Sequence, residues 1–299
     1  MMRALVFSID DAYVMPFKVL WHSLMTTASV PDQIPIFILH EATLSPASIT
    51  DLTDFFRKYE RSADFLDASA YVPDNLPLAD GDHVSKATFY RLFIASILPS
   101  RVSSVVYLDS DAVVIRSVRE LFEVELDLPV AACNHFRAVD EFRLCGPLGG
   151  SYFQGGVLVI DLDAWREQIL EESFKEIMAA ERERIRWWDQ DVLNIAFSGK
   201  WQRIPVWYNV SRDALQAMPV DCALENARFL HFDGSRKPWR TVNQHPLDYI
   251  WYDAYCEAFG SDFDKRRLGT GKAKVTKPLW RRSLALLRSR ARCVFLGRP

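Results

Sequence analysis

The 299-residue sequence lacks the features of a membrane-spanning, zinc-binding or repeat protein. No stretch approaches the roughly 20 uninterrupted apolar residues of a transmembrane helix. The five cysteines are scattered and contain no Cys-x-x-Cys pair, which argues against a zinc site or a redox centre. The apolar stretch at the N-terminus is too short, and too soon acidic, for a signal peptide. With 49% hydrophobic residues and no internal repeat, we expect a globular, cytoplasmic protein.

Acidic residues are missing from the C-terminal segment. Residues 265–299 hold 12 of the 36 Lys and Arg and none of the 39 Asp and Glu, so residues 1–264 keep 24 basic and 39 acidic groups, a net −15. Apolar residues of the segment, among them Trp280 and Phe295, fall near one helical face. A helix lying on an anionic membrane has this composition, and a solvated basic helix is the alternative. We expect a folded domain over 1–264 and a basic helical tail that holds the protein peripherally on the inner face of the membrane.

Short apolar segments alternate with helical patterns along the chain. The continuously apolar run at 103–109 is typical of a central strand in a mostly parallel sheet. Ligands bind outside the carboxyl ends of the strands in such α/β sheets. The other expected strands are 3–9, 34–40, 63–67, 129–136 and 152–162.

The helical segments carry recognisable boundary residues. Residues 45–59 predict a helix with Ser45 as N-cap and Pro46 in the first position. The longest pattern, 163–185, predicts one amphipathic helix with Ile169 and other apolar residues toward the core. Further helices are expected at 13–28, 86–99, 117–124 and 187–199.

Two acidic pairs stand at the ends of expected strands. Asp10 and Asp11 follow the first strand, and Asp109 and Asp111 close the central one. Residues two apart on a strand point the same way, so Asp109 and Asp111 can reach one divalent cation if the chain bends there, while Ser110 points oppositely. A simple turn is the alternative. Both pairs should lie on one rim of the sheet.

The segment "HFDGSRKPW", residues 231–239, contains groups that suit a metal and a phosphate. The imidazole of His231 is a good ligand for a cation such as manganese. Gly234 permits close approach of the backbone to phosphate oxygens, and Lys237 provides a point charge for them. A surface turn with a chance histidine and lysine is the alternative.

A third polar cluster, "WDQD" at 188–191, follows an aromatic stretch. Asp189 could accept hydrogen bonds from sugar hydroxyls, and Gln190 could sit near a reacting carbon without the charge of a carboxylate. The alternative is a helix N-terminus with favourable acids in its first turn.

Four motifs, in this order, resemble those of the family 8 retaining glycosyltransferases: "DSD" after "VVYL", "FQGGVLVIDL", "WWDQDVLN" and "HFDGSRKPW". The resemblance covers roughly residues 3–240, and four ordered motifs are far more specific than one. The family contains metal-dependent enzymes that use nucleotide sugars, and the chain is similar to its bacterial lipopolysaccharide galactosyl- and glucosyltransferases. The resemblance implies an α/β fold with a single GT-A type, Rossmann-like domain and a mostly parallel central sheet.

The resemblance also implies the ligands and their contacts. The donor would be a UDP-sugar, and the acceptor would be a glycan or lipid-linked glycan of surface polysaccharide synthesis. Asp109, Asp111 and His231 would bind Mn²⁺, or Mg²⁺, and Gly234 and Lys237 would hold the diphosphate. The resemblance assigns the other donor contacts as follows: Asp10 and Tyr13 at the uracil, with Asp11 and Ser110 in the same nucleotide-binding set; His83 and Arg91 bordering the donor; Asp189 on sugar hydroxyls; and Gln190 beneath the anomeric carbon.

Two positions depart from the family pattern. Ala12 stands where close members have a polar residue that contacts the nucleotide, and Gln154 replaces a more usual asparagine in the donor-binding set. Neither change touches the expected metal ligands. Both could alter the choice of donor sugar.

The expected reaction is transfer of a hexose, galactose or glucose, with retention of configuration. An amide such as Gln190 is a poor nucleophile, so we favour same-face displacement in which the leaving phosphate takes the acceptor proton. The alternatives are an inverting transferase, a self-glucosylating glycogen primer and a catalytically silent sugar-binding module. The acidic body argues against a specific nucleic-acid partner.

Overall fold

The computed structural model describes residues 2–79, 84–135, 144, 152–240 and 247–264. Contacts between residues divide the chain into two compact units, which we describe separately. The first unit comprises the described residues within 1–15, 30–110 and 119–204, and the second comprises those within 16–29, 111–118 and 205–264.

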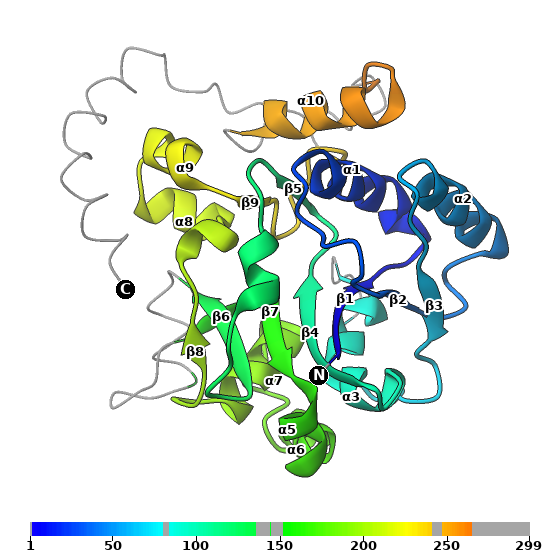
Figure 1. Cartoon of the computed structure of the whole chain (residues 1–299). Helices are drawn as coiled ribbons and strands as arrows, with labels where there is room; N and C mark the ends of the chain where they lie inside the picture. The colour runs from blue at the N-terminus through cyan, green and yellow to red at the C-terminus, as the bar shows by residue number, and fades with distance from the viewer. Residues whose placement is uncertain (1, 80–83, 136–143, 145–151, 241–246, 265–299) are drawn as a thin grey trace. The chain divides into compact units, whose positions relative to one another are not determined.

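Seven strands of the first unit form one sheet, in the order β3-β2-β1-β4-β7-β6-β8 (Figure 1). The pairs from β3 to β4 are parallel, β7 runs antiparallel to β4 and β6, and β8 is parallel to β6. The prediction of an α/β fold with a mostly parallel sheet is confirmed. The strands are β1 (Met2–Ser8), β2 (Ile36–His40), β3 (Asp64–Asp67), β4 (Val102–Leu108), β6 (Val130–Asn134), β7 (Phe153–Asp161) and β8 (Gln202–Arg203).

The central strands are apolar because they are buried on both faces. In β1, the four residues from Ala4 to Phe7 have no exposed surface, and in β4 the last four are buried as well. β1 and β4 are parallel neighbours, with Val6 paired to Tyr107. Because they run in the same direction, their carboxyl ends lie on one edge of the sheet.

Helices of the first unit pack against this sheet. The cap of α2 is as expected, because the Ser45 hydroxyl accepts a hydrogen bond from the amide of Ser48 and Pro46 stands first. The helix expected at 86–99 is instead a 3₁₀ segment, η2, that continues into a short α-helix, α3. The helical segments are η1 (Asp11–Tyr13), α2 (Pro46–Arg57), η2 (Lys86–Phe93), α3 (Ile94–Ile97), η3 (Arg119–Glu123), α5 (Leu162–Glu167), α6 (Leu170–Ala180) and α7 (Trp188–Ala196).

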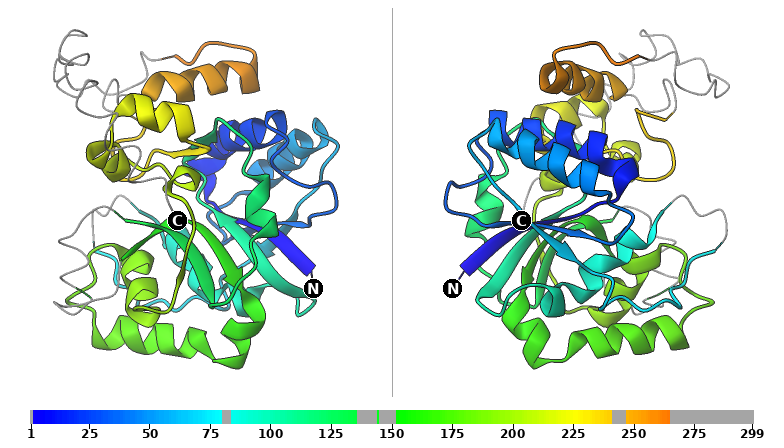
Figure 2. Two further views of the ribbon diagram at one scale, coloured as in Figure 1. Left: turned by 60° about the vertical axis from the view of Figure 1, so that its left-hand side comes forward. Right: turned by 90° about the vertical axis from the view of Figure 1, so that its right-hand side faces the viewer.

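The single long helix expected at 163–185 is wrong, because the chain breaks between α5 and α6. Ile169 at the break has a left-handed φ of 51° and a relative exposure of 65%, although the pattern assigned it to the core. Trp165 and Phe174 explain the break: nine residues apart, they would lie on opposite sides of a continuous helix. Both are fully buried, with ring centroids 5.2 Å apart. Figure 2 shows α6 at the lower edge of the first unit in both views.

A two-stranded antiparallel ribbon lies in the second unit. It pairs β5 (Ala112–Val114) with β9 (Phe229–His231), in a register that sets Ala112 opposite His231. Figure 1 shows this ribbon below α10 and to the left of α1, and Lys18 of α1 lies 6.0 Å from the ring of Phe259 in α10. The helical segments are η4 (Val206–Tyr208), α8 (Arg212–Ala217), α9 (Val220–Asn226), α10 (Asp248–Phe259) and most of α1 (Val14–Thr26).

The predictions about the membrane concern a spanning helix and the basic tail. Among the described residues, no helix combines the length and the apolar character needed to cross a bilayer. The basic tail at 265–299 lies outside the described residues, so its helix and its separation from a domain over 1–264 stay predictions.

Candidate functional site

The expected acids lie at the carboxyl ends of neighbouring strands in the first unit. Asp10 follows β1 and Asp109 follows β4, and these two strands are parallel partners. The sheet therefore places both residues on one edge, where α/β folds bind their ligands.

Arg91 ties three parts of this unit together. Its Nη2 donates to Asp109 Oδ1 at 2.6 Å, its Nη1 donates to the carbonyl of Gly155 at 2.5 Å, and its Nε lies 2.9 Å from Asp189 Oδ2. The guanidinium also lies 4.4 Å from the ring centre of Tyr107. The Arg91 side chain is 5% exposed, so one buried cation serves two carboxylates. The structure thus brings together Arg91, Asp109 and Asp189, which the sequence named separately.

Charge and burial shift the ionisation of this cluster. Burial alone would lower the pKa of Arg91, but the charges of Asp109 and Asp189 outweigh it and raise the pKa above its usual value. Burial raises the pKa of Asp189 to about 7, with Arg91 opposing the shift and Asp109 adding to it. Asp189 is therefore a carboxyl group that titrates near neutral pH.

Gln190 is held beside this cluster by backbone and side-chain groups. Its Oε1 accepts a hydrogen bond from the amide of Gly155 at 2.9 Å, and its Nε2 donates to the hydroxyl of Tyr152 at 3.1 Å. Gln154 lies next to this contact in β7, but its Oε1 accepts from the amide of Gly156 at 2.6 Å. The oxygen of Gln154 is thus engaged by its own strand.

The residues at the end of β1 have different surroundings. Asp10 is 9% exposed, and its Oδ1 has no hydrogen-bond partner among the residues that the structure describes. Asp11 is exposed, and its Oδ1 accepts from the amide of Ser45 at 2.9 Å. Hydrogen bonds from Ser45 and Ser48 lower the pKa of Asp11. Tyr13 ends the short η1 segment and is half-buried. Asp10 therefore has a carboxylate oxygen to offer a ligand, whereas Asp11 supports the chain before α2.

The second unit brings together Asp111, His231 and Lys237. His231 Nε2 lies 2.9 Å from Asp111 Oδ1, and Lys237 Nζ donates to Asp111 Oδ2 and, at 2.9 Å, to the carbonyl of Phe232. The other ring nitrogen of His231 lies 3.0 Å from Oδ1 of Asn209. The register of β5 and β9 explains this meeting, because the Phe232 amide bonds the Asp111 carbonyl at 2.9 Å.

The lysine dominates the ionisation of Asp111. Burial would raise the pKa of this carboxyl, but the charge of Lys237 and the hydrogen bonds from His231 and Lys237 hold the pKa well below its usual range. Lys237 is itself 4% exposed. Gly234, in the turn between His231 and Lys237, has a φ of 74°, which favours glycine over any residue with a side chain.

Asp109 and Asp111 stand at the two ends of a three-residue connection between β4 and β5. Each is paired within its own unit, Asp109 to Arg91 and Asp111 to His231 and Lys237. Ser110 between them is 4% exposed, and its hydroxyl has no partner within the described part of the chain. The carboxylate and imidazole at Asp111 and His231 fit a divalent cation that accepts both oxygen and nitrogen ligands.

His83, which the sequence assigns to the donor site, lies outside the described residues.

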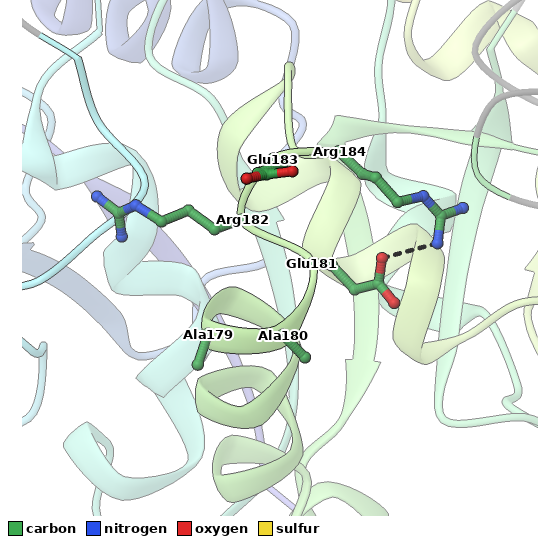
Figure 3. A pocket seen from close by; sticks show the side chains of 6 residues that line it. All are labelled: Ala179, Ala180, Glu181, Arg182, Glu183 and Arg184. Atoms are coloured by element: carbon green, nitrogen blue, oxygen red, sulfur yellow. Dashed lines mark hydrogen bonds and ion pairs between the residues drawn. The ribbon is translucent and has the colours of Figure 1, made fainter.

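A surface hollow at the end of α6 is lined by residues 179–184, where Glu181 and Arg184 form an ion pair at 2.7 Å (Figure 3). Arg182 donates to the carbonyls of Asn75 and Leu76. None of the candidate residues lines this hollow, so we do not place the chemistry there.

Comparison with known proteins decides the family. The sequence model described as "Glycosyl transferase family 8" matches residues 4–243. The chain belongs to this family. The resemblance of the four motifs to this family is thereby confirmed, and family membership makes the chain a glycosyltransferase.

Relatives in this family share modest identity with the chain. General stress protein A of Bacillus subtilis is 22% identical over 265 residues, which are 82% of this chain and 91% of that protein. A lipopolysaccharide 1,2-glucosyltransferase of Escherichia coli is 29% identical over 181 residues, 54% of this chain and 52% of that protein. The chain thus spans about half the length of this second relative.

A solved structure shows the same fold. The crystal structure of the galactosyltransferase LgtC, in complex with donor and acceptor sugar analogs, matches with a TM-score of 0.73 and 21% identity. The match covers 89% of this chain and 99% of that one. The expectation of a GT-A type fold is confirmed.

Sequence patterns did not single out three residues that the structure places at the site. Tyr152 contacts both Asp191 and Gln190, and Asn209 contacts His231. Asp191 belongs to the "WDQD" motif, but the pattern suggests only a helix-terminal acid. Tyr152 directly precedes the "FQGG" motif without belonging to it, and Asn209 stands in a segment without a recognisable polar pattern, so their roles depend on contacts between residues far apart in the chain.

Proposed function

We propose that this chain is a metal-dependent, retaining glycosyltransferase that moves a hexose, galactose or glucose, from a UDP-sugar to a hydroxyl of a glycan acceptor. The observation that carries the proposal is the meeting of Asp111, His231 and Lys237 from motifs some 120 residues apart in the chain. A carboxylate, an imidazole and a buried lysine in contact suit a cation and the phosphates that it accompanies.

The metal ligands in this proposal are Asp109, Asp111 and His231. Mn²⁺ fits this mixed oxygen and nitrogen set, and Mg²⁺ is the alternative. When bound, the cation would neutralise charge on the diphosphate as it leaves the sugar. Lys237 and the backbone at Gly234 would hold the same diphosphate, since a lysine offers a compact charge and a left-handed glycine allows close approach.

The first unit would bind the rest of the donor. Asp10 supports this assignment because its buried Oδ1 has no partner in the described residues and can accept from the N3–H of uracil. Tyr13, three residues on, would stack on the base, and Asp11 and Ser110 remain in the proposed nucleotide-binding set. His83 is kept as a proposed donor contact on the family resemblance alone.

Asp189, Arg91 and Gln190 would surround the donor sugar. Asp189 can accept from sugar hydroxyls, and Arg91 fixes its position through the 2.9 Å ion pair. Gln190 would lie beneath the anomeric carbon, with Gln154 nearby on β7 as a determinant of donor choice. The amide of Gln190 is neutral, so we propose same-face displacement: the bond from sugar to phosphate breaks, the acceptor oxygen bonds the same face, and the leaving phosphate takes the acceptor proton.

The proposed acceptor is a surface glycan, and the proposed location is the inner face of a membrane. The Escherichia coli relative is named as a lipopolysaccharide 1,2-glucosyltransferase, which supports an acceptor in lipopolysaccharide or another surface glycan. We propose that residues 1–264 form the transferase domain and that residues 265–299 attach it to the inner face of an anionic membrane. Liposome sedimentation of the full chain and of residues 1–264 tests the attachment, and equal binding of both would refute it.

A panel of UDP-sugars tests the reaction itself. We expect one UDP-hexose to be hydrolysed slowly in the presence of Mn²⁺, transferred to a glycan acceptor, and left intact after chelation with EDTA. NMR of the product's anomeric proton should show the configuration of the donor. Absence of turnover with every donor would refute the transferase, and an inverted product would refute the retaining mechanism.

A further inference from the structure

The amide of Gln190 lies in a chain of hydrogen bonds that continues past its first partners. Tyr152, which accepts from Gln190 Nε2 at 3.1 Å, donates its hydroxyl hydrogen to Asp191 Oδ1 at 2.5 Å. Asp191 Oδ2 accepts from the backbone amides of Arg186 at 2.7 Å and Trp187 at 2.9 Å. Asp191 has no exposed surface and Tyr152 is 2% exposed, so this chain of contacts is shielded from water.

The direction of each hydrogen bond follows from the number of hydrogens available. Both oxygens of Asp191 act as acceptors, so the single hydroxyl hydrogen of Tyr152 points toward Asp191. The Tyr152 oxygen is then an acceptor for Gln190 Nε2, while the Gly155 amide can only donate to Gln190 Oε1. A flipped Gln190 amide would oppose donor to donor at Gly155 and acceptor to acceptor at Tyr152. One orientation is therefore selected at both ends.

The backbone before Gln190 is also held by Asp191. Trp188 has a φ of 46°, an unusual conformation for a bulky residue, and it directly precedes Asp189 and Gln190. Asp191 binds the amides of the two residues before Trp188 and so closes the turn over 186–191. Strained backbone of this kind persists where surrounding contacts hold it, often at functional sites.

We propose that Tyr152 and Asp191 are positioning residues, which fix the amide of Gln190 in one orientation and the turn that carries it. This inference rests on the proposed function, in which Gln190 faces the anomeric carbon. Neither residue contacts the donor sugar in this scheme. Both act through Gln190, which distinguishes them from residues that bind substrate.

A double-mutant cycle with Tyr152→Phe and Gln190→Ala tests the inference through activity. We expect Tyr152→Phe to lower kcat about ten- to a hundredfold while KM for the UDP-sugar stays within about twofold, because a misplaced catalytic group costs rate. In the Gln190→Ala background the same change should alter kcat less than about twofold. An equal loss in both backgrounds, or no loss in the first, overturns the inference. Tyr59→Phe, a substitution in a half-buried tyrosine outside the site, is the matched control.

A second readout does not depend on turnover. In protein labelled with ¹⁵N-glutamine, the side-chain amide protons of Gln190 should exchange slowly, and Tyr152→Phe should speed their exchange at least about tenfold. Asp191→Asn places an NH₂ group against Tyr152 or the backbone amides and should have the same effect. Unchanged exchange in both variants overturns the positioning role. If the exchange rates change as expected but the wild-type chain shows no transferase activity, the failure lies in the proposed function.

Discussion

Arg91 and Asp189 form an ion pair in the first unit, with 2.9 Å between Nε and Oδ2 and side chains that are 5% and 7% exposed. The same guanidinium bonds Asp109 at 2.6 Å. One cation thus compensates two carboxylates that come from the end of β4 and the start of α7. Removing that cation leaves the buried carboxyl of Asp189 and the partly exposed carboxyl of Asp109 without their shared partner.

Arg91→Met should destabilise the protein by about 3 kcal/mol, since breaking a buried ion pair leaves an uncompensated charge. Urea unfolding measures the change. The matched control is Arg57→Met, because Arg57 pairs with Asp54 at 2.7 Å but both side chains are more than 60% exposed. The control should change stability by less than about 0.5 kcal/mol. Similar effects for the two substitutions would show that Arg91 does not compensate buried charge.

The stability of the folded protein should depend on pH through Asp189. Its folded pKa of about 7 lies above the ordinary value of 3.8. Between these two pH values, the folded state therefore holds a proton that the unfolded state has lost. Stability relative to Asp189→Asn should therefore fall as the pH rises from about 4 to 7 and level off above that, with about 1.4 kcal/mol per pH unit as the upper limit. Unfolding of both proteins at pH 5, 6, 7 and 8 measures this dependence. A constant difference across these pH values would show that Asp189 does not titrate in this range.

Asn209 should support metal binding through His231. A ligand histidine is oriented by the partner of its other ring nitrogen, and Asn209 Oδ1 lies 3.0 Å from His231 Nδ1. We expect Asn209→Ala to weaken Mn²⁺ binding about ten- to a hundredfold and His231→Ala to abolish detectable binding, as measured by titration calorimetry. Asn226→Ala removes a side chain that bonds the Cys222 carbonyl in the same unit and should leave Mn²⁺ affinity unchanged. Equal affinity of the Asn209 variant and the wild type would refute the supporting role.

Gly234 should resist substitution because of its backbone conformation and not for lack of space. Its φ is 74°, and a side chain added there would meet no atom within 4 Å. Gly234→Ala should cost about 1 kcal/mol of unfolding free energy, and Gly234→Asn less, since asparagine tolerates this region better. Gly155→Ala is the contrasting case, because its added carbon would make ordinary contacts of 3.6 Å or longer. Thermal unfolding of the three variants should rank Gly234→Ala as the least stable.

The alternation of apolar strands and helices determined the fold class and the edge of the sheet that carries the acids. Asp10 and Asp109 follow β1 and β4 because a buried strand ends where the sequence turns polar, and that rule acts within a few residues. The four ordered motifs likewise indicate the family without any knowledge of tertiary contacts. The cap at Ser45 and Pro46 was predictable for the same local reason.

Only the tertiary structure decided which groups meet and which helices break. Lys237 appeared in the sequence as a phosphate ligand, yet here it bonds Asp111, a residue 126 positions earlier. The helix expected at 163–185 breaks at Ile169 because the core requires Trp165 and Phe174 on one side, which helical spacing alone forbids. The contacts of Tyr152, Asp191 and Asn209 likewise join segments with no pattern between them. Periodicity reports which face of a segment is buried, whereas hydrogen-bond partners depend on how segments pack, and packing is a property of the whole fold.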